Sequence, residues 1–584
     1  MNQHTVPGGL SREDASSWQR IRRYAVPRWM IEQSGGRRLA GDWRGACTAA
    51  NVDPLLDPGE VADRYGTAVA ARLAEDLRHL APDLLRWHAP RMLGGSTVLQ
   101  ACRILLLARY GEPDGPADPS DPSGPYLYAE LPVMAHGPQR ISLRCGPVRP
   151  DTWQRRLRSP LEDWTAARHL WHAGHTAELR ERVAGGPGRL PFFTTAGRPL
   201  TPGELPTADP GPADPAGRAE WIAVLQDRGD EAEALEAAGF EPDPGGAPGR
   251  PWYSEPAWIL GRLGAGLHRI GPEVRRLTEA GAGERFAIAT PGSMYLLLQP
   301  AGTHPDAGVR IGYAHRNLPD GVVPLPGHAW QRPPDPALVR AGLITPRALH
   351  PLVAAALFPE AGPADGPPAP TAPAPVRVRC GDGWHEVGYR DGRPDMPHTE
   401  QEQQRERAMR AFGGAVTGCF AVQQALTGTE GRLPRALRAQ LQDLLQHALH
   451  GDTPGVVALL DAGLDPRVRV AGGRTLLHLL HLVDHERLLP RLLAAGLDLE
   501  AHDKQLRTPL YAAVHGGGSP DLVRALLGAG ARIDITDQSK MSLAQMITRY
   551  RRTDLAFLAE RTEAECPGIG AVWWDRYNER IADR

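Results

Sequence analysis

The chain reads Leu492-Leu493-Ala494-Ala495-Gly496-Leu497-Asp498 near its C-terminus, and two close variants of this stretch flank it at a fixed distance. The variants are Leu459-Leu460-Asp461-Ala462-Gly463-Leu464-Asp465 and Leu526-Leu527-Gly528-Ala529-Gly530-Ala531-Arg532, which places the three shared glycines 33 and 34 residues apart. A second set keeps the same step: Thr475-Leu476-Leu477-His478, Thr508-Pro509-Leu510-Tyr511 and Ser542-Leu543-Ala544. Two independent sets of marks at one period indicate a repeat architecture.

The residues of one repeat predict two helices. Thr508 can cap a first helix, and Pro509 fits the first turn of that helix, where a missing N–H costs nothing. Apolar side chains line one face of a second helix, at Leu522, Val523, Leu526 and Leu527. Gly530 suits the end of that helix, because glycine adopts a left-handed backbone without a Cβ penalty.

The segment from about Leu441 to Arg561 resembles ankyrin repeats, whose unit is a β-turn and two antiparallel helices opening with Thr-Pro-Leu-His. The middle opening departs from this pattern at Leu476, the next at Tyr511, and the first unit lacks the opening. We expect about four units over residues 436–584, the outer two acting as caps, with the last helix running into Trp573 and Trp574. The resemblance implies an α-helical solenoid that recognises a protein partner.

In ankyrin-repeat proteins the hairpin tips contact the partner, so the resemblance assigns the partner-binding residues of this chain. They are Arg467, Arg469, Arg474, Glu500, His502, Lys504, Gln505, Arg507, Asp537 and Lys540. The alternative is that these are ordinary solvated loop residues, since only a few residues dominate any interface.

The preceding part of the chain predicts a multidomain protein in which a mixed α/β (α+β) region of unrecognised fold comes first. We divide the chain into a mainly helical domain over 1–110, a mixed α/β domain over 126–360, a Pro/Ala/Gly-rich linker over 361–375, a β-hairpin plus long helix over 376–430, and the repeats over 436–584. Within these ranges, residues 126–134, 140–148, 286–299 and 309–314 are expected as strands, and residues 150–183 and 399–427 as helical.

Composition narrows the classes of function. A net charge of −2 over 584 residues gives no electrostatic reason to expect nucleic acid or a membrane as partner. Neither a signal sequence nor an apolar run that could span a bilayer is apparent, and the six cysteines form no Cys-x-x-Cys pair, so we expect a reduced, cytoplasmic protein. The 66 basic residues include only two lysines, a bias typical of a GC-rich bacterial genome. Because both lysines follow residue 503, the front region cannot hold a P-loop or a pyridoxal Schiff base.

Three groups in the front region could carry chemistry, and ordinary packing is the simpler interpretation of each. His169-x-x-His172-x-x-His175 is the one compact set of metal-capable residues, but its members spread around a helix. The basic and aromatic segment from Arg20 to Trp29 could contact nucleic acid. The third group could form an acid–base set from His79, Asp83, Trp87 and His88. We therefore assign no catalytic, cofactor-binding or metal-binding residue.

The sequence favours a non-enzymatic interaction, scaffold or regulatory protein that recognises its partner through ankyrin repeats. The alternative is an enzyme or toxin-like effector with a catalytic domain in 1–360, which the array would target. Such an enzyme would need a concave site with convergent polar groups.

Overall fold

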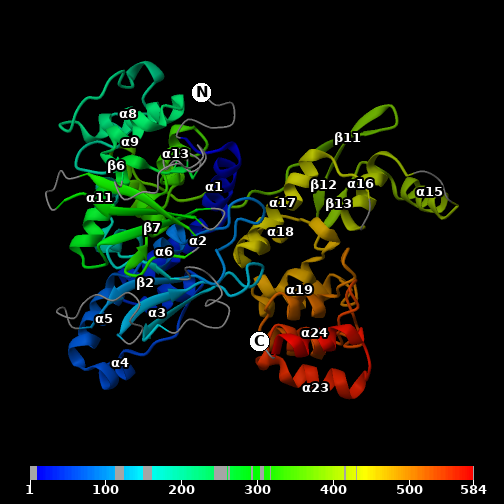
Figure 1. Cartoon of the computed structure of the whole chain (residues 1–584). Helices are drawn as coiled ribbons and strands as arrows, with labels where there is room; N and C mark the ends of the chain where they lie inside the picture. The colour runs from blue at the N-terminus through cyan, green and yellow to red at the C-terminus, as the bar shows by residue number, and fades with distance from the viewer. Residues whose placement is uncertain are drawn as a thin grey trace. The chain divides into compact units, whose positions relative to one another are not determined.

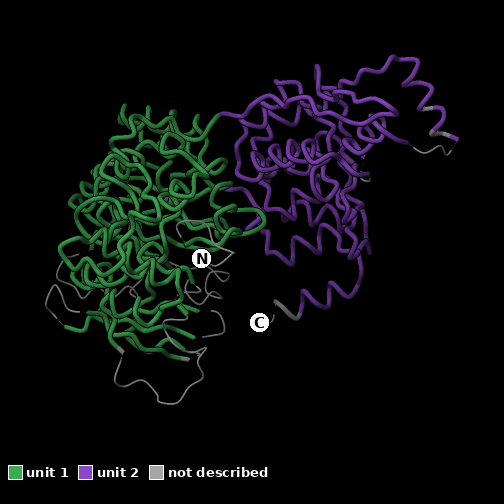
Figure 2. Tube along the Cα trace, turned by 90° about the horizontal axis from the view of Figure 1, so that it is seen from above, with its two compact units in different colours: residues 1–133, 140–368 green, residues 134–139, 369–584 purple. Residues whose placement is uncertain are grey.

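The computed structural model describes residues 9–111, 124–148, 161–242, 259–260, 263–290, 294–302, 308–315, 317–412, 416–428 and 431–582. The chain forms two compact units, one of residues 1–133 and 140–368 and the other of residues 134–139 and 369–584 (Figure 2). The boundary after Pro368 falls within the Pro/Ala/Gly-rich segment 361–375. Among the described residues, no helix is both long and apolar enough to cross a bilayer.

The first unit begins with six helices that pack around a five-stranded sheet (Figure 1). The helices are α1 (Arg12–Tyr24), α2 (Arg28–Leu39), α3 (Trp43–Ala49), α4 (Pro58–Tyr65), α5 (Thr67–His79) and α6 (Pro82–His88). The sheet has the order β1-β4-β3-β2-β5, from β1 (Val52–Pro54), β2 (Ile104–Arg109), β3 (Tyr126–Glu130), β4 (Ile141–Gly146) and β5 (Leu161–Asp163). Strands from the ranges 1–110 and 126–360 thus share one sheet.

Two segments of this region differ from expectation. Residues 104–109 belong to the range expected to be helical, yet they form β2, because a short and fully buried apolar run looks alike in a helix and a strand. The segment expected as one helix over 150–183 instead contains β5, two turns of 3-10 helix and a short α7 (Glu178–Ala184), and residues 149–160 lie outside the described residues.

A second five-stranded sheet follows, with the order β10-β7-β8-β9-β6. Its strands are β6 (Phe240–Pro242), β7 (Arg285–Thr290), β8 (Met294–Pro300), β9 (Val309–His315) and β10 (Val322–Pro324). The helices that share its core are α8 (Pro215–Arg228), α9 (Glu231–Ala237), α11 (Leu267–Glu279) and α12 (Gly327–Trp330). Two later helices pack elsewhere, α13 (Pro334–Arg340) on α1 and α14 (Pro351–Leu357) on α7. The expected strand range 286–299 contains two antiparallel strands, β7 and β8, on either side of residues 291–293, which lie outside the described residues, and β9 covers the expected range 309–314.

The two sheets have the same topology and the same register. In each, three consecutive antiparallel strands form the centre, the preceding strand pairs in parallel with the last of them, and the following strand pairs in parallel with the first. One row of paired residues runs Pro54, Leu143, Ala129, Leu105, Glu162 in the first sheet and Pro242, Ile311, Leu298, Phe286, Val323 in the second. The first unit therefore contains two copies of one supersecondary structure.

A short sequence match accompanies this duplication. The chain reads Ala-Ala-Asn-Val-Asp-Pro over 49–54 and Ala-Ala-Gly-Phe-Glu-Pro over 237–242, where each copy passes from a helix into its first edge strand. Asn51 and Gly239 hold equivalent left-handed conformations, with φ of 53° and 79°. Both residue types tolerate this backbone well, which explains why they occupy this position.

The second unit starts with a small module of residues 376–428 (Figure 1). A hairpin of β11 (Val376–Cys380) and β12 (Gly383–Arg390) continues into a third strand, β13 (Arg393–Asp395). Two helices follow, α15 (Glu400–Ala411) and α16 (Gly418–Thr427), where the sequence predicted one long helix. Gly418, at the start of α16, has a φ of +58°, so a single α-helix cannot continue through this position.

Four helix pairs complete the second unit. They are α17 (Arg435–Leu449) with α18 (Thr453–Asp461), η9 (Leu476–Leu482) with α19 (His485–Ala494), α20 (Pro509–His515) with α21 (Pro520–Gly528), and α22 (Leu543–Arg549) with α23 (Ala556–Glu565). Successive pairs pack on one another through η9, α20 and α22. A separate helix, α24 (Val572–Ala582), carries Trp573 and Trp574, so the last pair does not run into them as expected. The second helix of the last pair, α23, ends before Gly568 and Gly570, which both have positive φ.

Candidate functional site

Three hairpin tips connect successive helix pairs, and they share one backbone geometry. Each tip is closed by an N–H to carbonyl bond, from Val470 to Arg474 (2.9 Å), from Asp503 to Arg507 (3.0 Å) and from Asp537 to Met541 (3.3 Å). The residue before the last of each tip is left-handed: Gly473, Leu506 and Lys540 have φ of 73°, 60° and 58°. The tips therefore repeat at the same step of 33 and 34 residues as the helices.

Four of the residues predicted to bind a partner are exposed on the middle and last tips. His502, Lys504, Gln505 and Lys540 are exposed. Arg507 is half-buried against Asp503, with 2.7 Å between Nη2 and Oδ2.

Two carboxylates near these tips accept hydrogen bonds from backbone N–H groups of the repeats. Glu500 accepts a hydrogen bond from the backbone of Arg532, at 2.9 Å from N to Oε1. Asp537 accepts bonds from the backbone N–H groups of Ser539 (2.9 Å) and Met541 (3.0 Å), which shapes the last tip. Both therefore contribute to the conformation of the surface as well as to its charge.

The first tip is tied to the module that precedes the repeats. Arg469 donates from Nε to the carbonyl oxygen of Thr427 (3.2 Å), and from Nη1 to those of Gly473 (2.6 Å) and His502 (2.9 Å). Arg474 is half-buried, and burial lowers the pKa of its guanidinium. Arg467 pairs with the buried carboxylate of Asp465 at 3.0 Å. Partner contact through these three arginines stays a prediction, and each also has a role within the fold.

One exposed residue of the middle tip was not among the predicted partner-binding residues. Leu506 is 53% exposed although it is a large apolar residue. The sequence-based prediction included only polar and charged residues at the tips, so Leu506 was not among them. The sequence could have indicated Leu506, because it occupies the position of Gly473 in the 33-residue repeat. A leucine is unusual at a position where the backbone is left-handed.

These hairpins and helix pairs define a helical repeat protein in the C-terminal part of the chain. The family model for "Ankyrin repeats (3 copies)" matches residues 444–537, so this part of the chain consists of ankyrin repeats, as the sequence predicted. The N-terminal region matches no family model. A search of curated proteins found no match to the chain.

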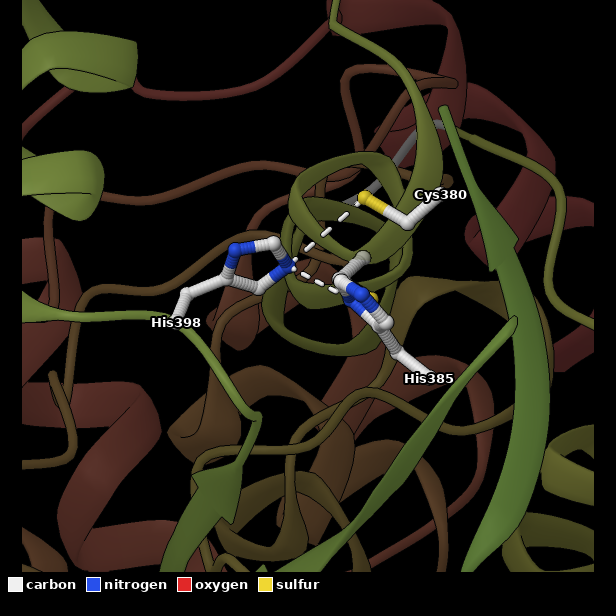
Figure 3. A group of neighbouring side chains, drawn as sticks. Cys380, His385 and His398 are labelled. Carbon is white, nitrogen blue, oxygen red and sulfur yellow. Dashed lines mark hydrogen bonds between the residues drawn. The ribbon is translucent and has the colours of Figure 1, made fainter. Parts of the chain in front are cut away.

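A second candidate site lies in the module before the repeats, where two cysteines and two histidines converge. Figure 3 shows three of them, Cys380, His385 and His398. Cys380 ends β11, His385 lies in β12, His398 precedes α15, and Cys419 is in the first turn of α16. One ligand atom from each of the four side chains lies within 4.8 Å of the other three. His398 Nε2 is 3.1 Å from His385 Nδ1 and 3.6 Å from Cys380 Sγ, and Cys419 Sγ is 3.6 Å from His385 Nδ1.

The surroundings of this cluster hold the four side chains close together. Gly418 packs against Cys380, and a Cβ at residue 418 would lie 2.5 Å from Cys380 Sγ and 2.9 Å from Cys380 Cα. The outer nitrogen of His398, Nδ1, faces Glu402 at 3.7 Å from Oε2. Burial, with the nearby Cys380, raises the pKa of the fully buried Cys419 thiol to about 12. A cation among the four groups would have the opposite effect, because thiolate ligation displaces the proton.

Sequence reasoning assigned no metal ligand here because the spacing is long and irregular. The four residues follow the pattern Cys-x4-His-x12-His-x20-Cys, without the paired Cys-x-x-Cys of common zinc sites. The usable signal was that Cys380 and His385 flank the turn of a predicted hairpin, which brings their side chains together.

The first unit contains a cavity of about 390 Å³, lined by His88, Arg91, Trp164, His169 and His328, among other residues. His169 and His328 have equivalent positions in the two copies of the duplicated structure. Two residues beyond each, the carbonyl oxygens of Trp171 and Trp330 accept bonds from Ala81 N and Gly266 N, both at the start of a helix.

Polar groups in this cavity lack partners within the described part of the chain. Nε and Nη1 of Arg91, Nδ1 of His169 and both ring nitrogens of His328 are buried without a hydrogen bond. Burial lowers the pKa of all three side chains. Buried polar groups without partners that line a cavity are a common feature of small-molecule sites.

The three groups singled out in the front region do not assemble as sites of their own. His169 lies in the cavity, whereas the rings of His172 and His175 contact each other, with centroids 4.7 Å apart, and His172 Nε2 is 3.9 Å from Asp76, so His169 is separate from the other two histidines. The basic segment has Arg22 buried, with Nε 2.5 Å from Asp335 Oδ1. In the acid–base set, Asp83 bonds to His350 at 2.9 Å, away from His79.

Proposed function

We propose that the chain recognises a protein partner through the exposed hairpin tips of its ankyrin repeats, which form a short solenoid together with their helix pairs. The observation that carries this proposal is the exposed, left-handed Leu506 in the middle tip. Ankyrin repeats generally mediate protein–protein interaction.

Leu506 costs free energy in two ways in the isolated chain. A left-handed backbone costs a residue with a Cβ roughly 1–2 kcal/mol, and its apolar side chain faces water. Gly473 avoids both costs at the equivalent position. Local strain and exposed apolar side chains both concentrate at binding surfaces.

The charges around Leu506 indicate the chemistry of the partner. Lys504 and Lys540, the two lysines of the chain, are exposed on the middle and last tips. The carboxylate of Asp503 is buried and paired with Arg507, whereas the ammonium groups of Lys504 and Lys540 are exposed. We propose a partner that offers an apolar pocket for Leu506 with acidic side chains around it.

The test compares partners captured by variants of the full chain. We expect the native chain to capture a partner from a lysate of cells in which the chain naturally occurs. Leu506→Gly and Lys504→Glu should both remain folded, and both should fail to capture that partner. Arg487→Ala is the matched control, because Arg487 is also exposed but lies on α19, away from the tips. If both tip variants retain every partner of the native chain with unchanged affinity, the tips are not the recognition surface.

A second candidate function belongs to the cavity of the first unit. We propose that it binds a small organic anion, supported by the buried Arg91, whose Nε and Nη1 lack partners and whose electrostatic neighbours are the cationic Arg86 and Arg22. The volume of about 390 Å³ fits a small metabolite-sized molecule. This is the part of the chain in which an enzymatic activity would reside.

Tryptophan fluorescence tests this second candidate, because Trp18 and Trp164 line the cavity. We expect a saturable change on titration with a panel of small carboxylates and phosphate esters, and loss of the change in Arg91→Met. Arg487→Ala should behave as the native chain. A response that Arg91→Met retains, or no response to any member of the panel, rejects the anion site.

A further inference from the structure

Cys380, His385, His398 and Cys419 converge from four separate elements, and three of the distances between their ligand atoms are close to those of a tetrahedral zinc site. With Zn–S near 2.3 Å and Zn–N near 2.0–2.1 Å, a regular tetrahedron places S and N about 3.6 Å apart and N and N about 3.3 Å apart. Cys380 Sγ to His398 Nε2 and Cys419 Sγ to His385 Nδ1 are both 3.6 Å, the N to N distance is 3.1 Å, and all four ligand atoms lie within 4.8 Å of one another. We infer that these residues bind one Zn²⁺ ion in a structural Cys2His2 site.

The donor set selects this metal. Two thiolates and two imidazoles at tetrahedral spacing are the preferred environment of Zn²⁺, whereas Mg²⁺ and Ca²⁺ require oxygen ligands. On binding, two S–H bonds are replaced by two Zn–S bonds, and the two protons pass to solvent. The imidazoles bind as neutral bases through His385 Nδ1 and His398 Nε2. Four protein ligands leave no position open for a substrate, so the site is structural rather than catalytic.

The surroundings support a metal site rather than a chance cluster. Glu402 faces Nδ1 of His398, the nitrogen turned away from the cluster, as carboxylates commonly do behind a zinc-bound histidine. Cys419 lies in the first turn of the ten-residue helix α16, where the helix dipole favours a thiolate. Gly418 permits the approach of this helix to Cys380, because any larger residue would contact Cys380 Sγ.

The module of residues 376–428 also needs such a cross-link. Its buried apolar side chains are few, among them Val378, Val387, Val422 and Leu426, while Trp384 and Phe412 are 58% and 89% exposed. Domains of this size commonly depend on a metal or disulfides, because they cannot bury enough apolar surface. A zinc ion would join the hairpin, the start of α15 and α16 at one point.

The site has a consequence for the repeats. The carbonyl oxygens of Leu426 and Thr427, at the end of α16, accept bonds from Arg469 N (2.9 Å) and Arg469 Nε (3.2 Å) in the first hairpin tip. The module therefore covers the first tip and acts as an N-terminal cap of the array. Zinc, by fixing α16, would hold this cap in place.

The metal content of the full chain tests the inference. We expect one zinc per chain by elemental mass spectrometry after dialysis, in the native chain and in Cys566→Ser, a cysteine of the same unit outside the cluster. Cys419→Ser should lose most of the metal. An equal zinc content in Cys419→Ser and the native chain, or no zinc in a native chain purified without chelators and given zinc, overturns the assignment.

Cobalt spectroscopy separates metal binding from a folding defect. Co²⁺ in the native chain should show tetrahedral ligand-field bands and thiolate-to-cobalt charge transfer. Cys380→His keeps four ligands, so it should retain the ligand-field bands with about half of the charge-transfer intensity. Charge transfer unchanged in Cys380→His would show that Cys380 is not a ligand, and octahedral bands in the native chain would exclude the site.

Hydrogen exchange tests the link between the metal and the array. In Cys419→Ser, the amides of residues 465–474 should exchange faster than in the native chain, whereas Cys566→Ser should leave them unchanged. Unchanged protection of the first tip in a zinc-free Cys419→Ser chain would show that the metal does not support the cap.

Discussion

Gly473 and Leu506 have the same position in two successive hairpins and the same left-handed backbone, with φ of 73° and 60°. Only the glycine adopts this conformation without steric cost. The same turn therefore occurs twice in one chain, in a relaxed form with Gly473 and in a strained form with Leu506.

The first prediction concerns this strain. Leu506→Gly should raise the free energy of unfolding of the array by about 0.5–1 kcal/mol, because it removes the unfavourable contact of Cβ with the backbone while an exposed leucine contributes little packing. Urea denaturation of the full chain, followed by circular dichroism, measures the change. Leu506→Ala retains a Cβ and should not be stabilised, and equal stabilisation by alanine would refute the explanation.

The second prediction concerns acid sensitivity. His478 is buried in the opening turn of η9, where Thr475 donates to Nδ1 from its backbone N–H (3.2 Å), and burial lowers the pKa of the imidazole to about 4 from 6.5. Between these values the unfolded chain binds a proton that the folded chain does not. The contribution of His478 is therefore fully present above pH 6.5 and is lost as the pH falls toward 4.

Urea denaturation across this pH range checks the second prediction. The stability of the native array should fall with decreasing pH, and His478→Gln should reduce the slope by up to about 1.4 kcal/mol per pH unit. His485→Gln is the control, because His485 lies on α19 and is not fully buried. An unchanged slope in His478→Gln would show that His478 is protonated alike in the folded and unfolded chain.

The third prediction concerns the close contact at Gly418. Gly418→Ala should destabilise the module by more than about 1 kcal/mol, since it adds both a left-handed alanine and a Cβ lying 2.5 Å from Cys380 Sγ. Gly530→Ala is the matched control, because Gly530 is also left-handed but has open space around the added Cβ. Proteolysis of residues 376–428 and urea denaturation compare the two, and equal effects would mean that the contact with Cys380 is unimportant.

The fourth prediction concerns a buried ion pair between α7 and α11. Arg182 Nε and Glu273 Oε1 are 2.5 Å apart, and both side chains are nearly inaccessible to solvent. Arg182→Met should lower the free energy of unfolding of the first unit by about 3–5 kcal/mol, because it leaves the carboxylate without this partner. The double variant Arg182→Met/Glu273→Leu should recover part of that loss. A double variant as unstable as the sum of both single changes would indicate that the two residues do not interact.

The sequence predicted the repeats because their signal is local. Thr508, Pro509 and Gly530 act on the helix to which each belongs, and the same choices recur after 33 or 34 residues. The duplication in the first unit has no such signal beyond 49–54 and 237–242, because a mixed sheet places strands together that lie far apart along the chain.

The candidate sites also differ in whether their residues could be predicted from the local sequence. The tips were predictable from the repeat period, but the internal bonds of Arg469 to the carbonyl oxygens of Thr427 and His502 depend on how the module packs. Cys380 and Cys419 were visible as isolated cysteines, and nothing in their spacing of 39 residues indicated that they meet.

By itself, the sequence determined the ankyrin repeats, their period and the position of their tips, since each repeat is built from contacts within about one period of chain. Only the tertiary structure decided the strand order of the duplicated sheets, the cavity that contains His169 and His328, and the cluster of Cys380, His385, His398 and Cys419. The physical reason is that these features depend on contacts between distant segments, which form only when buried surfaces pack.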